Sequence, residues 1–125
     1  MKVYNREIDS VLTGLNFDRI ETEEETLGLY HVNTDSGSID FVDLLPNTYY
    51  RSHIHDTVDS ELHVLRGNGF IIINGKDISY GPGDVFSVLR GTPHGFRTKD
   101  RTIFLSIQSS AILDRQTGKM DFRYE

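Results

Sequence analysis

Most of the chain is a succession of short segments rich in β-branched and aromatic residues, separated by turn residues at roughly even spacing. In order, these segments are LGLYHVN, SIDFVDLL, YYRSHIH, ELHVLR, FIIIN, KDISY, DVFSVL and TIFLSIQ. Asn74 and Gly75 join two of them, and this dipeptide favours a tight hairpin turn because both of its residues tolerate positive φ. Many short strands at even spacing predict an all-β fold, either a sandwich or a small barrel.

One short helix is expected before the strands. Apolar residues at positions 8, 11, 12 and 15 have the spacing of one helical face, which predicts a helix over about residues 6–14. The β-rich segments predict a barrel over about residues 27–124. No internal repeat or linker divides the chain, and 125 residues suit one compact domain. We therefore expect a single domain over residues 1–125.

Composition and charge argue against several classes of function. The net charge of −6 argues against a nucleic-acid partner, which would require a basic face. The absence of cysteine excludes thiolate metal ligands, disulfides and a cysteine nucleophile. The first ten residues are too polar for a secretory signal, and no apolar run approaches the roughly 18 residues of a membrane span. We therefore expect a cytoplasmic protein with no membrane partner.

Three of the five histidines lie between positions 53 and 63. Residues two apart in a strand project from the same face, so His53 and His55 would lie side by side. Neutral imidazole is the commonest protein ligand for metal ions, so this pair favours a metal site. Two exposed strand histidines are the alternative interpretation. A second stretch, GPGDVFSVLRGTPHGF, contains a further histidine, His94.

Together these two stretches resemble the two motifs of the cupin superfamily. HIH at 53–55, Glu61 and VLRG at 64–67 are similar to the first motif. GPGDV and RGTPHGF are similar to the second motif, with the family's histidine at His94. The resemblance covers about residues 39–108 and implies a double-stranded β-helix, also called a jelly-roll barrel. It also implies that the three histidines and a glutamate hold one divalent metal ion, which could be Fe, Mn, Zn or Ni.

The carboxylate of this expected site departs from the family pattern. The family's spacing after the second histidine reaches Ser60, so Asp59 lies one residue early and Glu61 one residue late. A one-residue β-bulge would turn Glu61 inward, and we expect Glu61 to be the fourth ligand. The alternatives are Asp59 or no carboxylate at all. If Ser60 faces inward, the apolar Leu62 faces inward with it, which favours packing.

Strand alternation also nominates residues for the pocket. Counting back from the histidine pair places Tyr49 and Arg51 on the inward face. Arg51 would then bind a substrate anion or lie at the barrel rim, because an unpaired buried arginine is costly. His63 is a candidate base if it faces inward with Glu61, so Arg51 and His63 are the candidate catalytic residues. His31 has no visible partner and is interpreted as a surface or hydrogen-bonded histidine. The other expected pocket residues are Phe96, Phe104 and Gln108.

The resemblance implies a range of functions, because one fold hosts many chemistries. The favoured prediction is a metal-dependent enzyme of isomerase or lyase type, acting on a small oxygen-rich molecule such as a carbohydrate or carboxylate. The alternatives are a non-haem iron dioxygenase and a non-catalytic sensor that binds metal or a small ligand. Small cupins resemble one another in pairing their sheets, so we also expect a homodimer. The candidate edge segments for it are LGLYHVN and SIDFVDLL.

Overall fold

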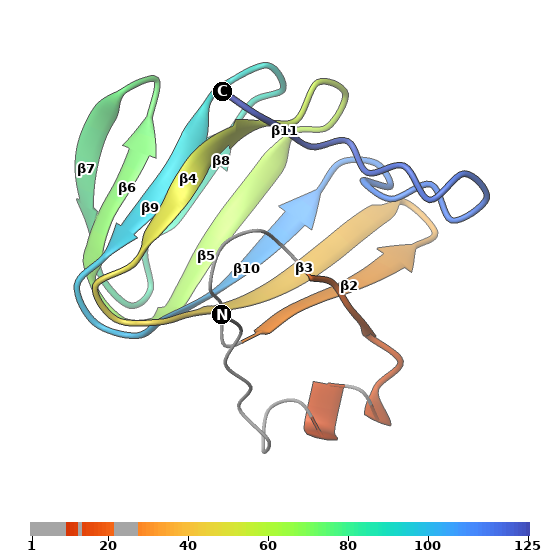
Figure 1. The fold of residues 1–125 in the computed structure, drawn as a ribbon, viewed down its shortest axis with the longest axis horizontal. Helices are drawn as coiled ribbons and strands as arrows, with labels where there is room; N and C mark the ends of the chain where they lie inside the picture. The colour runs from red at the N-terminus through yellow and green to blue at the C-terminus, as the bar shows by residue number, and fades with distance from the viewer. Residues whose placement is uncertain (1–9, 13, 22–27) are drawn as a thin grey trace.

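The computed structural model describes residues 10–12, 14–21 and 28–125 (Figure 1). Residues 10–12 and 14 are helical. The helix expected over about residues 6–14 is therefore seen only in its second half, and its first four residues lie outside the described part of the chain. Leu12 is buried, whereas Val11 and Leu15 are exposed, so only part of the expected apolar face packs against the protein.

The described residues form two antiparallel sheets that pack face to face, which confirms the expected all-β cupin-type architecture (Figure 1). The strand order is β1-β2-β3-β10-β5-β8 in the larger sheet and β11-β4-β9-β6-β7 in the smaller sheet. The strands are β1 (Asp18–Arg19), β2 (Gly28–Thr34), β3 (Gly37–Leu44), β4 (Tyr49–Ile54), β5 (Ser60–Arg66), β6 (Gly69–Ile73), β7 (Lys76–Tyr80), β8 (Val85–Val88), β9 (His94–Thr98), β10 (Thr102–Gln108) and β11 (Arg123–Tyr124).

The eight segments expected as strands correspond to β2–β8 and β10, with small differences at their ends. The expected hairpin joins β6 to β7, and both Asn74 (φ 51°) and Gly75 (φ 75°) have positive φ. Strand β9 was not expected, because its sequence HGFRT has no run of β-branched residues. This segment is a strand because it pairs with β4 and β6, although its local sequence does not predict one.

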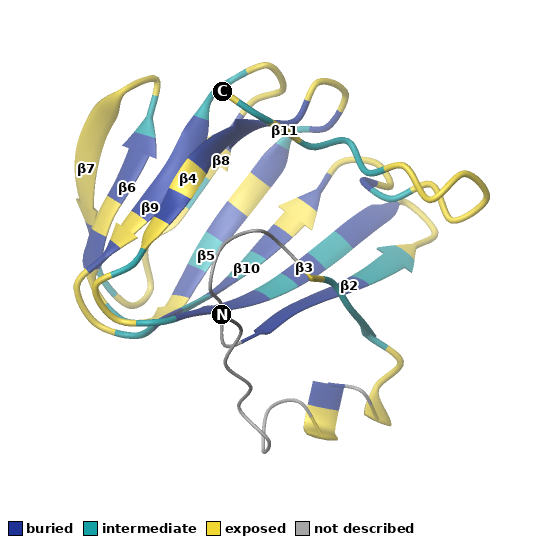
Figure 2. Cartoon of the chain, viewed as in Figure 1, coloured by how far each residue is buried: buried dark blue, intermediate teal, exposed yellow. Residues whose placement is uncertain are grey.

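The core lies between the two sheets, where inward-facing side chains interdigitate. Along β5, buried and exposed residues alternate, as expected for a strand with one face in the core (Figure 2). Phe96 of β9 and Phe104 of β10 stack across the two sheets with ring centroids 4.4 Å apart. Burying each side chain of this size contributes roughly 1.5–3 kcal/mol to folding. The core residues are Leu29, Val42, Leu44, Tyr50, Leu62, Val64, Ile71, Tyr80, Val88, Phe96 and Phe104.

Strands β4 and β9 approach closely because residue 95 of β9 is a glycine. A Cβ at this position would be 2.5 Å from the carbonyl oxygen of Tyr50, which is closer than real side chains come to a backbone atom. The pairing shifts register between Tyr50 and His53, so that His53 lies opposite His94. Glycine and the register shift together bring two of the expected ligands to neighbouring positions.

The expected edge segments are only partly at an edge. Strand β3 pairs with both β2 and β10, so the prediction that SIDFVDLL is an edge strand is wrong. Strand β2 pairs with β3 along one side and with only the two residues of β1 on the other. Among the described residues, the rest of that second side has no neighbouring strand. No helix in the described ranges is long and apolar enough to cross a membrane.

Candidate metal centre

His53, His55 and His94 lie together on the inner face of the smaller sheet. One nitrogen of each ring lies within 4.8 Å of the corresponding nitrogens of the other two, and all three side chains are buried. The ring centroids of His53 and His94 are 4.3 Å apart, and that of His55 is 5.1 Å from each. Strand β4 supplies His53, β9 supplies His94, and His55 directly follows β4. His53 and His55 project from the same face, as predicted, and His94 joins them to form a cluster of three.

Each of these histidines has its Nδ1 atom against a backbone carbonyl oxygen. The partners are the carbonyl of Arg51 for His53 at 2.9 Å, that of Asp121 for His55 at 2.6 Å, and that of Thr92 for His94 at 2.9 Å. A carbonyl only accepts hydrogen bonds, so each Nδ1 carries the proton and donates it. The lone pair of each neutral ring is therefore on Nε2. Metal-binding histidines are typically oriented in this way.

Burial keeps the imidazoles of His53 and His94 uncharged. Burial holds the pKa of His53 well below its usual value of 6.5, and the neighbouring His94 lowers it further. Burial is also the main cause that lowers the pKa of His94 to about 4. Both rings are thus neutral near neutral pH and offer unprotonated nitrogens.

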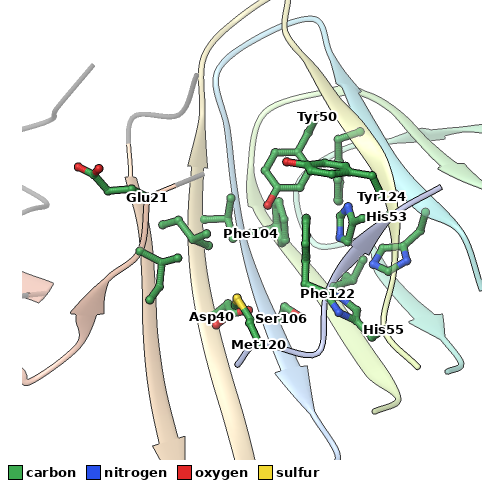
Figure 3. A pocket seen from close by; sticks show the side chains of 16 residues that line it. Glu21, Asp40, Tyr50, His53, His55, Phe104, Ser106, Met120, Phe122 and Tyr124 are labelled. Carbon is green, nitrogen blue, oxygen red and sulfur yellow. The ribbon is translucent and has the colours of Figure 1, made fainter. Parts of the chain in front are cut away.

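A pocket opens in front of the three rings (Figure 3). Its cavity of about 230 Å³ suits one small molecule. Its aromatic lining comes from both sheets and comprises Tyr50, Phe96, Phe104, Phe122 and Tyr124. Apart from the histidines, the lining side chains with carboxylate or aliphatic hydroxyl groups are Glu21, Asp40 and Ser106. The walls are therefore mostly apolar, with few polar groups to orient a ligand.

Residues 120–124, which we call the strap, cross the pocket beside the histidines. Met120, Phe122 and Tyr124 alternate along the strap and line the pocket (Figure 3). Phe122 stacks on His53 with ring centroids 4.6 Å apart and an angle of 23° between the planes. Strap residue Asp121 supplies the carbonyl that binds His55. The strap therefore forms one wall of the pocket and orients the rings of His53 and His55.

The strap is held by the carboxylate of Asp121. Its oxygens accept hydrogen bonds from the backbone nitrogens of Asp56 and Thr57, each at 2.8 Å, and from the Thr57 hydroxyl at 2.7 Å. Burial alone would raise the pKa of Asp121, but these hydrogen bonds outweigh it and hold the pKa below its usual value. Asp56 in turn receives two hydrogen bonds from the guanidinium of Arg123.

A family model described as a cupin domain matches residues 40–107, which is more than half of the chain. The chain belongs to the cupin family. The matched range agrees with the resemblance inferred from the two motifs, and it contains His53, His55 and His94. No curated protein matches the sequence.

Solved structures with the same fold include several small cupin-like proteins. One is a conserved protein with a double-stranded β-helix domain from Klebsiella pneumoniae, with 18% identity, a TM-score of 0.63, and coverage of 86% of this chain and 84% of that one. Pac13, a nucleoside dehydratase from Streptomyces, has 15% identity, a TM-score of 0.63, and coverage of 87% and 84%. KdgF from a Halomonas species has 19% identity, a TM-score of 0.63, and coverage of 80% and 91%. At these identities the likeness shows the fold.

This cupin does not bring Glu61 to the histidines. The side chain of Glu61 is 54% exposed and lies 2.6 Å from His63. Ser60, Leu62 and Val64 occupy the buried positions of β5 instead, so the expected bulge that would turn Glu61 inward is not formed at this position. The prediction that Glu61 faces the cluster is wrong, because packing of the apolar residues decides the strand's orientation. His63, the candidate base, lies on the outer face with it.

The alternative carboxylate also lies elsewhere. Asp59 accepts two hydrogen bonds from the guanidinium of Arg90, both at 3.1 Å, and one from the Arg90 backbone nitrogen. The residue at the family's carboxylate position is Ser60, which is buried and whose hydroxyl has no hydrogen-bond partner in the described structure. The candidate centre within the described residues therefore has three imidazoles and no carboxylate.

Two expected pocket residues on β4 point the other way. Tyr49 is exposed and lies under the guanidinium of Arg97, and Arg51 is exposed with its guanidinium 3.8 Å from the ring centroid of Tyr124. Simple alternation from His53 predicted both to face inward. The register shift between Tyr50 and His53 reverses that alternation, so Tyr50 lines the pocket instead.

The remaining expected pocket residues lie on the inner face. Phe96 and Phe104 line the pocket, while Gln108 is buried behind it and hydrogen bonds to Asp40 and Ser106. Sequence reasoning missed the strap, although the alternation of Met, Phe and Tyr in MDFRY is a strand-like pattern that could have indicated it. It also missed Glu21 and Asp40, for which no motif gave a signal.

Proposed function

We propose that this cupin is a metal-dependent enzyme of isomerase or lyase type that acts on a small oxygen-rich molecule. The observation that carries the proposal is the set of three Nε2 lone pairs converging at the pocket, each fixed by a carbonyl on the opposite ring nitrogen. Neutral imidazoles in this arrangement suit Fe, Mn, Zn or Ni. His53, His55 and His94 would hold the ion.

A divalent ion bound by three neutral ligands supplies Lewis acidity, which polarises a substrate oxygen and makes a neighbouring C–H or C–O bond easier to break. The chain's own residues bind and enclose the substrate. Phe104, Phe122 and Tyr124 present aromatic surface that excludes water and packs on a flat ligand. Because the cluster has no carboxylate, an ion held there would have positions for substrate oxygens.

The comparisons support this class of reaction. Pac13 is a nucleoside dehydratase, and the loss of water that a dehydratase catalyses is an elimination. An elimination needs an apolar pocket that holds a hydroxylated molecule and a group that stabilises the developing negative charge. The apolar pocket of this chain offers the first, and an ion held by its histidine cluster would supply the second.

The decisive measurement is metal content by elemental analysis after purification and dialysis against a weak chelator. We expect one Fe, Mn, Zn or Ni ion per chain in the wild type and almost none in His94→Ala. His63→Ala is the matched control, because His63 is a histidine on the outer face and should not change the content. Equal metal content in wild type and His94→Ala would overturn the proposed site.

The reaction class is tested separately on the metal-loaded protein. We expect isomerisation or water loss in one-dimensional NMR spectra of sugars, nucleosides and hydroxy acids incubated with it, and no reaction with His94→Ala. Substrate-dependent consumption of oxygen would instead indicate a dioxygenase. A protein that binds the ion but converts none of these compounds would be a binding module.

A further inference from the structure

A row of polar side chains crosses the inner face of the larger sheet, where the core is otherwise apolar. His31 of β2 pairs with Asp40 of β3, and Asp40 pairs with Ser106 of β10, each as direct cross-strand neighbours. All three are buried, and Asp40 and Ser106 line the pocket. Asp40 and Ser106 project from the sheet that faces the one carrying the histidine cluster (Figure 3).

Both ring nitrogens of His31 face oxygen acceptors. Nδ1 lies 2.6 Å from Oδ1 of Asp40, and Nε2 lies 2.7 Å from Oδ1 of Asn33. The Asn33 amide cannot be turned round without losing a bond, because its Nδ2 donates to the carbonyl of Leu113. His31 must therefore donate from both nitrogens, which makes it an imidazolium. Burial lowers the pKa of His31, but the hydrogen bonds and charge of Asp40 outweigh this and raise it.

A fully buried imidazolium requires a counter-charge, and Asp40 supplies it as an ionised carboxylate. An ionised carboxylate accepts about four hydrogen bonds. Among the described residues, Asp40 accepts one from His31 and one from Nε2 of Gln108 at 3.0 Å. Since Asp40 lines the pocket, acceptor positions remain for a ligand.

Ser106 provides the complementary donor. The Nε2 atom of Gln108 donates to Oγ of Ser106 at 2.7 Å, and Ser38 fixes the Gln108 amide by donating to its Oε1 atom. Ser106 therefore accepts a hydrogen bond, while its own proton has no acceptor in the described part of the protein. The Asp40 and Ser106 oxygens share one amide donor, so a single ligand group can reach both.

We propose that Asp40 and Ser106 form a hydroxyl-binding subsite that faces the histidine cluster and selects a neutral, sugar-like ring. A hydroxyl can donate to Asp40 and accept from Ser106 at the same time. A ligand carboxylate at this position would be repelled by Asp40. Aromatic walls between the two polar ends suit the flat face of a hydroxylated ring. This inference rests on the proposed function and names its substrate class.

The test uses protein freed of metal by dialysis against a strong chelator, so that it does not depend on the histidine site. The probes are D-ribose, D-xylose, D-glucose and, as the charged counterpart, D-glucuronate, followed by saturation-transfer NMR and titration. We expect at least one neutral sugar to bind and glucuronate to bind more weakly than glucose. Asp40→Asn removes a charge-assisted hydrogen bond to the sugar, and Ser106→Ala removes a neutral one. Each variant should therefore bind the neutral sugar about tenfold more weakly.

Ser106→Ala keeps the pair of Asp40 and His31, so it remains informative if Asp40→Asn unfolds. Asp77→Asn, an exposed carboxylate change on β7, is the control and should bind as wild type. Metal content measured on the same variants should be unchanged, which separates this subsite from the metal centre. The proposal is overturned if no neutral sugar binds, if glucuronate binds more tightly than glucose, or if neither subsite variant weakens binding.

Discussion

The ring of Phe122 stacks on the ring of His53 at a centroid distance of 4.6 Å. The two residues are 69 positions apart in the sequence, and the pairing of β11 with β4 brings them together. Because Nδ1 of His53 is held by the Arg51 carbonyl, the stacking fixes the remaining freedom of the ring. Phe122 thus restricts a candidate ligand, although its own side chain has no ligand atom.

Phe122→Ala should therefore weaken metal binding by about tenfold, as is typical when a group that orients a ligand is removed. Phe70→Ala is the control, because Phe70 is an exposed phenylalanine on β6. Competition with a chromogenic chelator measures both affinities. Equal affinities in the two variants would mean that the strap does not orient His53.

Glu61→Gln and Asp59→Asn should leave metal affinity at the wild-type value. Glu61 lies against His63 on the outer face, and Asp59 is bound by Arg90. The same chelator competition compares them with His94→Ala, which should lose binding. A clear loss in Glu61→Gln alone would show that β5 turns its other face to the ion when metal binds.

Gly95→Ala should destabilise the protein by about 1–3 kcal/mol, the usual cost of overpacking. The added methyl would meet the Tyr50 carbonyl at 2.5 Å and push β4 from β9, which carry His53 and His94. Metal binding should fall with stability. Gly81→Ala is the control, since a Cβ there meets no atom within 4 Å. Denaturant unfolding measures both, and similar midpoints for the two variants would contradict the close approach.

The metal-free protein should lose stability as the pH falls from 6.5 towards about 4. The folded state holds the pKa of His94 below its unfolded value, so the unfolded chain binds the proton more readily and gains stability in this window. A shift of this size is worth on the order of 3 kcal/mol. His31 acts with the opposite sign, because folding raises its pKa. The contribution of His31 is the same in the wild type and in a variant that lacks His94.

His94→Gln removes this contribution, together with the effect of His94 on the pKa of His53, and thermal unfolding across the pH range measures the result. The variant should show a shallower loss of stability between pH 6.5 and about 4 than the wild type. Parallel pH profiles would mean that His94 protonates as easily in the folded as in the unfolded chain.

The homodimer stays a prediction. Light scattering and sedimentation over a wide range of dilution should give twice the chain mass of 14.3 kDa. A monomer at every concentration would contradict it.

The local sequence determined much of this protein. Even spacing of β-branched segments predicted the all-β fold, and Asn74-Gly75 predicted the hairpin between β6 and β7. Two motifs, HIH and TPH, indicated all three clustered histidines. These predictions succeeded because strand alternation and turn chemistry act over a few residues, within reach of a sequence pattern.

Only the tertiary structure decided which side chains face the pocket. A register shift in β4 turned Tyr49 and Arg51 outward, and packing of Leu62 turned Glu61 outward with His63. The strap and the row from His31 to Ser106 join residues far apart in the chain. One residue of register reverses the face of every side chain on a strand, and that register is set by neighbouring strands and the shared core.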